Sequence, residues 1–205
     1  LALAGGDVDS NEVRNLFDYM YWAHERMLRP LADLPNEEFV RPLNSGHSSL
    51  RDTLVHILSV EWIWLSRWHG ISPPALLDPA LFPDLESVEK RWASIRHELQ
   101  RFLGQIRDEN LVVPISYRSV RGEELALPLI CTLEHVVNHH SYHRGQMATL
   151  LRQLGRERAE DDARTDGDGG PVRHRARGTE HLRDVHEQEG ADRGAERRSN
   201  AADGH

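Results

Sequence analysis

The sequence predicts an all-α protein: a four-helix bundle with a small β-hairpin before its last helix and a disordered C-terminal tail. Four segments within the first 154 residues place apolar residues three and four positions apart, the spacing of helices that bury one face. Between the third and fourth segments the apolar period changes to that of strands, and beyond residue 154 large apolar residues become rare. We therefore predict a flexible N-terminus (1–10), one helical domain (11–154) and a charged tail (155–205).

The first two helices are predicted at residues 11–34 and from residue 48 or 49 to residue 68. Ser10 is a suitable N-cap for the first helix, and Pro30 is expected to kink it or end it early. Gly70 stops the second helix. Because the second helix is apolar almost all round, we expect it to be central in the bundle.

The third helix is predicted at residues 85–106, where apolar residues line one face and charged residues the other. Two short apolar runs, 111–117 and 124–127, flank Gly122 and predict a β-hairpin with a glycine turn. The fourth helix is expected to start near Pro128, a residue favoured in the first turn, and to run to the end of the domain.

Composition and charge argue against several functions. The formal net charge of -8 argues against nucleic-acid binding, which needs a clustered basic surface. No apolar run approaches the roughly 20 residues that cross a bilayer, so we expect no membrane span. The single cysteine, Cys131, excludes an intramolecular disulfide and cysteine-rich zinc sites, and it fits a reducing cytoplasm. Lys90 is the only lysine, which we interpret as the codon bias of a GC-rich bacterial genome.

The predicted tail, residues 155–205, is rich in Arg, Asp, Glu and Gly, and its aliphatic residues larger than alanine are Val172, Leu182 and Val185. Such a segment buries too little apolar surface to offset the entropy of ordering it, so we predict disorder. We further hypothesise that this tail is an out-of-frame translation of GC-rich DNA. A native transcript that encodes this tail in the intact reading frame would contradict that hypothesis.

Histidines of the last predicted helix indicate a metal site. Residues four apart lie on one helix face, so two imidazoles at that spacing can bind a single ion. The pairs His135/His139 and His139/His143 both have this spacing. At about 100° per residue, His139 and His143 lie in the middle of the apolar stripe, whereas His135 lies on its flank. We expect the central pair to be ligands, because two buried imidazoles otherwise need separate hydrogen-bond partners.

The second predicted helix supplies a third imidazole. His56 shares its face with Thr53 and Val60, as an inward-pointing residue would, although such a histidine can also simply pack. Three neutral imidazoles with an open fourth position suit Zn²⁺, Ni²⁺, Co²⁺ or Fe²⁺, and an open position is typical of catalytic sites. His47 and His24 are less favoured as members of the site.

The residues around these histidines resemble those of a known family. The runs Asn138-His139 and His143-Arg144-Gly145-Gln146, with His56 inside the segment 54–65, are similar to the DinB/YfiT-like proteins. The resemblance covers residues 10–154 and includes Tyr21-Trp22-Ala23 of the first helix. It implies an up-down-down-up four-helix bundle, often homodimeric, with a divalent metal bound by His56, His139 and His143. Proteins of this kind usually continue past residue 154 with an Asp and more apolar residues, whereas this chain turns into the charged tail.

The resemblance also implies a chemistry. Related families include S-transferases and isomerases in which the metal holds a low-molecular-weight thiol as a thiolate, because a Lewis acid lowers the pKa of the group that it binds. We therefore expect a metal-dependent thiol S-transferase that acts on a small electrophile. A metal-dependent hydrolase and a non-catalytic, stress-related metal-binding module are the alternatives. Asn138 and Gln146 are candidates to orient ligands or substrate, although residues of this kind more often cap a helix or face solvent. Glu61 is a candidate general base or hydrogen-bond partner of a ligand, and a salt bridge or dimer contact is its simpler role.

Overall fold

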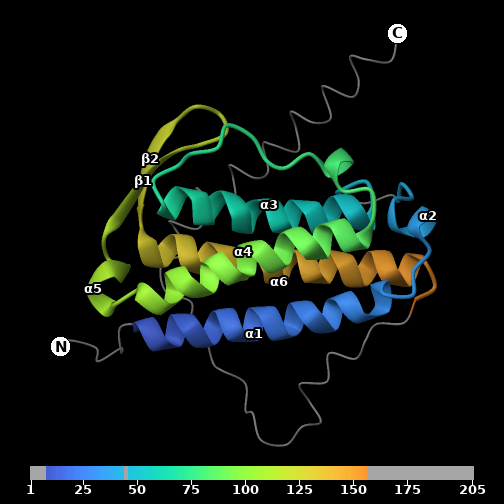
Figure 1. Ribbon diagram of the computed structural model, residues 1–205, viewed down its shortest axis with the longest axis horizontal. Coiled ribbons are helices and arrows are strands. Elements are labelled where there is room, and N and C mark those ends of the chain that lie inside the picture. Colours follow the sequence, from blue (N-terminus) through green and yellow to red (C-terminus); the bar gives the residue numbers. More distant parts are fainter. Residues whose placement is uncertain (1–7, 44–45, 157–205) are drawn as a thin grey trace, which may run out of the picture. The chain divides into compact units, whose positions relative to one another are not determined.

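The computed structural model describes residues 8–43 and 46–156, all within one compact unit, residues 1–161. Four long helices form the bundle: α1 (Ser10–Leu28), α3 (Leu50–Trp68), α4 (Leu85–Gln105) and α6 (Leu129–Gln153) (Figure 1). The connections contain the short helices α2 (Asn36–Phe39) and α5 (Asp108–Leu111), the 3-10 turns η1 (Arg29–Leu31) and η2 (Pro79–Leu81), and the strands β1 (Pro114–Arg118) and β2 (Glu124–Pro128). The predicted bundle with a hairpin before its last helix is confirmed. The predicted flexible N-terminus up to residue 7 and the predicted tail from residue 157 lie outside the described residues.

Contacts at the helix ends show the direction of each helix. The backbone N–H of Ser10, which begins α1, donates to the carboxylate of Asp108, just after α4, so these helices are antiparallel. Trp68 at the end of α3 stacks on Phe102 near the end of α4, with ring centroids 5.1 Å apart, so these helices are parallel. The Trp68 indole N–H donates to Thr132 near the start of α6, at 2.8 Å. The order is therefore up-down-down-up, as predicted (Figure 1).

Local sequence explains the bounds of α1. Its N-cap is Asp9 and not the predicted Ser10: the Asp9 carboxylate accepts the N–H of Glu12 at 2.8 Å, and the Glu12 carboxylate accepts the N–H of Asp9. This reciprocal capping box satisfies N–H groups that have no partner within the helix. The helix ends at Leu28, earlier than its apolar spacing suggests, and a 3-10 turn that contains Pro30 follows. Proline lacks the N–H that would continue the helix, so the early end expected there is observed.

The hairpin is shorter at its start than predicted: β1 begins at Pro114, because Leu111 belongs to α5 and a turn at 112–113 separates the two elements. Its strands pair antiparallel, with Ser116 opposite Ala126. Gly122 has a φ of +88° in the turn, a conformation that glycine adopts without steric strain. Tyr117 of β1 is buried and packs edge-on against Trp64 of α3, with ring centroids 4.9 Å apart. The hairpin therefore packs on the central helix.

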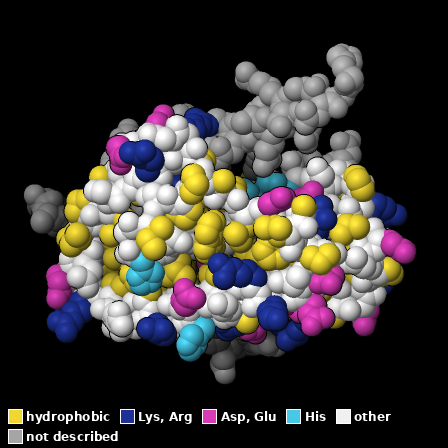
Figure 2. All heavy atoms as spheres, turned by 45° about the horizontal axis from the view of Figure 1, so that its top comes forward, with side chains coloured by type: hydrophobic (Ala, Val, Ile, Leu, Met, Phe, Trp, Pro, Cys, Tyr) yellow, Lys and Arg dark blue, Asp and Glu magenta, His cyan; other side chains and the backbone are white. Residues whose placement is uncertain are grey.

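Most side chains of α3 are buried, which confirms its predicted central place. On the face shown in Figure 2, Lys and Arg side chains are interspersed with Asp and Glu, and hydrophobic side chains lie between them. Over residues 8–43 and 46–156, no helix is both long and apolar enough to span a membrane.

Candidate metal centre

Imidazoles from α3 and α6 meet inside the bundle. The Nε2 atoms of His56 and His139 lie 3.0 Å apart. The rings of His139 and His143, one turn apart on α6, have centroids 4.2 Å apart, and the His143 centroid lies 4.7 Å from that of His56. The structure thus brings the three predicted ligands together between two antiparallel helices. Their binding of a metal stays a prediction.

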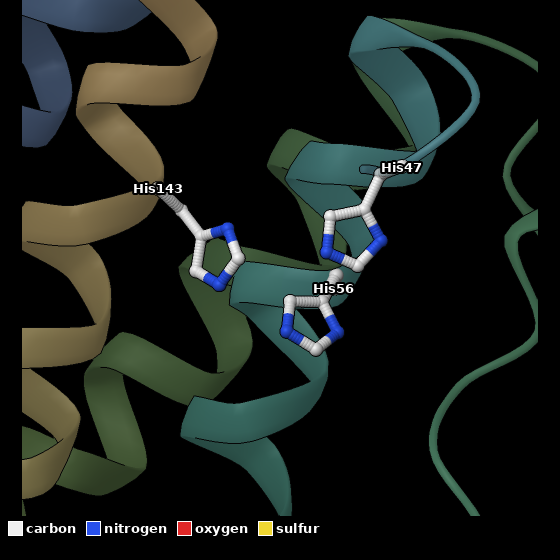
Figure 3. Close-up of side chains that lie close together, drawn as sticks. All are labelled: His47, His56 and His143. Carbon is white, nitrogen blue, oxygen red and sulfur yellow. The ribbon is translucent and has the colours of Figure 1, made fainter. Parts of the chain in front are cut away.

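His47 joins this group, although its position in the sequence made it a less favoured candidate. Its ring lies 4.2 Å from that of His56 and 5.3 Å from that of His143, which points across from α6 (Figure 3). One ligand nitrogen from each of these three histidines lies within 4.8 Å of the other two. His47 precedes Ser49, the N-cap of α3, and helical spacing carries no information about a side chain outside a helix. Its sequence proximity to that N-cap was the available signal.

The donor set fits a divalent transition-metal ion. A tetrahedral ion with metal–nitrogen bonds of about 2.0–2.1 Å holds its ligand atoms roughly 3.4 Å apart, close to the separation of His56 and His139. Burial lowers the pKa of His139 well below its usual value, and the neighbouring imidazoles of His143 and His56 act in the same direction. A neutral imidazole keeps the lone pair that a metal ligand needs.

Gln146 orients one of the imidazoles. Its side-chain oxygen lies 2.7 Å from Nδ1 of His143, three residues earlier on α6. Since an amide oxygen only accepts, Nδ1 carries the proton and Nε2 keeps its lone pair. Hydrogen bonds of this kind fix the tautomer and direction of metal-binding histidines. Gln146 is one of the two residues that the sequence offers for this role, and the structure provides its contact.

Two further histidines lie apart from the group. His135 is buried on the flank of α6, where its ring centroid lies 5.7 Å from that of Trp64 and 5.9 Å from that of His139. His24 of α1 packs instead against Trp92 of α4, with ring centroids 3.7 Å apart, and against His140. His24 therefore belongs to a separate polar cluster, which agrees with the expectation that it is less favoured as a member of the metal site.

The burial of His24 predicts that the folded protein loses stability at acidic pH. His24 is buried, and neither of its ring nitrogens has a hydrogen-bond partner among the described residues. Burial, and secondarily the charges of His140, Arg144 and Arg96, lowers its pKa well below the usual value. The unfolded chain therefore binds more protons than the folded chain once the pH falls below about 6.5, and the free energy of unfolding decreases from there toward the folded pKa.

His24→Leu should remove this contribution. We expect the slope of the free energy of unfolding between about pH 6.5 and 5 to fall by up to roughly 1.4 kcal/mol per pH unit. Urea unfolding with metal chelated measures the slope. His97→Leu, at an exposed histidine of α4, is the control. An equal change of slope in the control would show that burial of His24 is not the cause.

The fold and the histidine group define a class of protein, a four-helix bundle with a candidate metal centre between antiparallel helices. The family model for the DinB family matches residues 9–181, and this chain belongs to that family. The predicted family resemblance is thus confirmed. The match also runs past residue 154 into the segment predicted as a tail.

Two curated proteins of Bacillus subtilis (strain 168) are similar to this chain. Protein DinB is 27% identical over 154 residues, which cover 72% of this chain and 88% of that protein. The uncharacterized protein YizA is 26% identical over 144 residues, which cover 67% of this chain and 85% of that protein. The match to a crystal structure of a DinB-like protein from Bacillus cereus ATCC 10987 covers 71% of this chain and 94% of that chain, with 20% sequence identity and a TM-score of 0.49.

Proposed function

We propose that this chain is a divalent-metal-dependent enzyme that transfers a low-molecular-weight thiol to a small electrophile. The observation that supports it is the meeting of the His56, His139 and His143 imidazoles between α3 and α6. These three residues would hold one ion, for which Zn²⁺, Ni²⁺, Co²⁺ and Fe²⁺ are the candidates. When bound, such an ion supplies Lewis-acid activation of a thiol.

The chain's own residues prepare the site for that chemistry. Burial keeps the His139 imidazole neutral, and Gln146 holds His143 in the tautomer that presents Nε2. In the proposed reaction the S–H bond breaks, its proton passes to water, and sulfur forms a bond to the electrophilic carbon. When the electrophile is a conjugated double bond, its π bond breaks as sulfur adds, and water returns one proton to the neighbouring carbon. When the electrophile carries a leaving group, the bond from carbon to that group breaks and the group departs with the electron pair, so that atoms and charge balance in both cases.

The second candidate function is a non-catalytic metal-binding module, and His47 is the observation that favours it. Its ligand nitrogen lies within 4.8 Å of those of His56 and His143, so it could supply a further ligand to an ion held by these two residues. A site closed by four protein ligands is typical of structural metal centres, whereas catalytic centres keep one position for water or substrate. The role of His47 therefore distinguishes the two functions.

Metal reconstitution with and without His47 tests the proposal. We would strip the full chain of metal, add back each ion, and measure conjugation of cysteine and glutathione to a chromogenic electrophile. The enzyme proposal predicts metal-dependent turnover in the parent, and turnover that His47→Ala preserves or increases because the fourth position is then open. Bound metal without turnover in either protein would support the binding module, and hydrolysis of an activated ester in place of conjugation would indicate a hydrolase.

A homodimer and a cytoplasmic location, both drawn from the sequence, stay predictions. Sedimentation equilibrium of the full chain measures the first, and fractionation of the source cells measures the second.

A further inference from the structure

A buried carboxylate lies on the otherwise apolar central helix. Glu61 of α3 has a relative exposure of 0%, and each of its contacts comes from a different long helix. The Tyr21 hydroxyl of α1 donates to Oε1, and the Trp92 indole N–H of α4 donates to Oε2 at 2.7 Å. Nε2 of His140 on α6 lies 3.2 Å from the same Oε2, a close polar contact without hydrogen-bond geometry. All four helices of the bundle therefore meet at one side chain.

The contact partners show that this carboxylate is an acceptor and not a further metal ligand. Tyr21 stays protonated, since burial, followed by the charge of Glu61, raises its pKa well above the usual value. Both carboxylate oxygens are engaged by these partners, and Glu61 is not among the residues whose ligand atoms group with His47. The general-base role weighed for Glu61 would need contact with a substrate, which a fully buried side chain lacks.

The position of Glu61 along α3 connects it to the histidine group. It lies five residues after His56, about 7.5 Å further along the helix axis. Along α3, Glu61 lies between His56 and Trp68, and on α6 its contact His140 directly follows His139, which contacts His56. Successive residues of a helix are rotated by about 100°, so a fixed His140 also fixes the direction in which the rest of α6 points its side chains.

We propose that Glu61 is a positioning residue for the candidate metal centre. Through its close contact with His140 it sets the rotation of α6 about its axis, and that rotation turns His139 and His143 toward α3. A buried polar contact restricts rotation in this way because any other rotation moves the His140 nitrogen away from the carboxylate and leaves it among apolar side chains. An apolar contact at the same place would allow neighbouring rotations at small cost. This inference rests on the proposed metal function.

Cobalt binding tests the role of Glu61, because the visible absorption of Co²⁺ reports ligand geometry. We would titrate the metal-stripped full chain with Co²⁺ and compare the parent with Glu61→Leu and Glu61→Gln. The leucine variant should bind Co²⁺ at least about tenfold more weakly and with an altered spectrum, which is the lower end of the loss that follows when residues supporting the ligand orientation are replaced. The glutamine variant should be weakened less, since its amide oxygen still accepts from one donor.

Thr132→Val is the matched control. It removes a buried hydrogen bond between the same two helices away from Glu61, so it should lower stability to urea but leave the Co²⁺ affinity and spectrum as in the parent. A folded Glu61→Leu variant with parental Co²⁺ affinity and spectrum would overturn the inference. If the leucine variant does not fold, parental Co²⁺ affinity and spectrum in Glu61→Gln would overturn it instead. A parent that binds no Co²⁺ would overturn the proposed metal function, and this inference with it.

Discussion

His139→Ala is expected to purify with little metal, whereas the parent should carry about one equivalent. His139 is central in the group, with an Nε2 atom 3.0 Å from that of His56 and a ring against that of His143. Removing it leaves two of the three predicted ligands, and two imidazoles retain a divalent ion poorly during purification. Metal retained by His139→Ala would instead indicate that His47 binds the ion together with His56 and His143, whose ligand nitrogens lie within 4.8 Å of its own. Elemental analysis of both proteins, expressed with the same metal supply, measures the difference.

His135→Ala is the strict control for this prediction. It removes another buried histidine of α6, one turn before His139, that lies on the flank of the group. We expect it to keep the parental metal content. Equal loss of metal from both variants would place the site at the His135/His139 pair, and equal retention by both would argue against a metal centre at His139.

Trp64→Ala should give the largest loss of stability, about 3–5 kcal/mol in the free energy of unfolding. Trp64 is only 2% exposed, and it contacts Tyr117 of the hairpin and the guanidinium of Arg67, which lies 4.6 Å from its ring centroid. The substitution leaves a cavity where the hairpin packs on the central helix. Urea unfolding of the metal-free proteins measures the change.

Trp22→Ala is the matched control, because it removes the same side chain at a position that is 41% exposed. We expect it to lower the free energy of unfolding by no more than about 1 kcal/mol. A loss as large as that of Trp64→Ala would mean that the exposed face of α1 is buried in solution, and a small loss at Trp64 would contradict the packing described here.

Sequence reasoning succeeded where one helix determines geometry by itself. The 3–4 spacing of apolar residues predicts the four long helices, and Pro30 predicts the early end of the first. The i, i+4 spacing of His139 and His143 places both rings on one face for the same reason. Helices α2 and α5 were not predicted, because a four-residue segment is too short to show a period.

Contacts between elements were harder to predict. His47 lies before the N-cap of α3, and only the path of the chain into that helix brings it to His56. Glu61 is a charged residue on an otherwise apolar helix, and the sequence alone did not decide among its candidate roles. Its partners Tyr21 and Trp92 are distant in sequence and carry no pattern that connects them to it.

The sequence by itself determined the family, the four long helices and the histidines of α3 and α6 that face inward, because these depend on local spacing and on a recognisable motif. Only the tertiary structure decided that His47 completes a group of four imidazoles and that Glu61 joins all four helices. The physical reason is that the rotation and register of packed helices depend on side chains from every element at once, and these residues become neighbours only when the bundle has assembled.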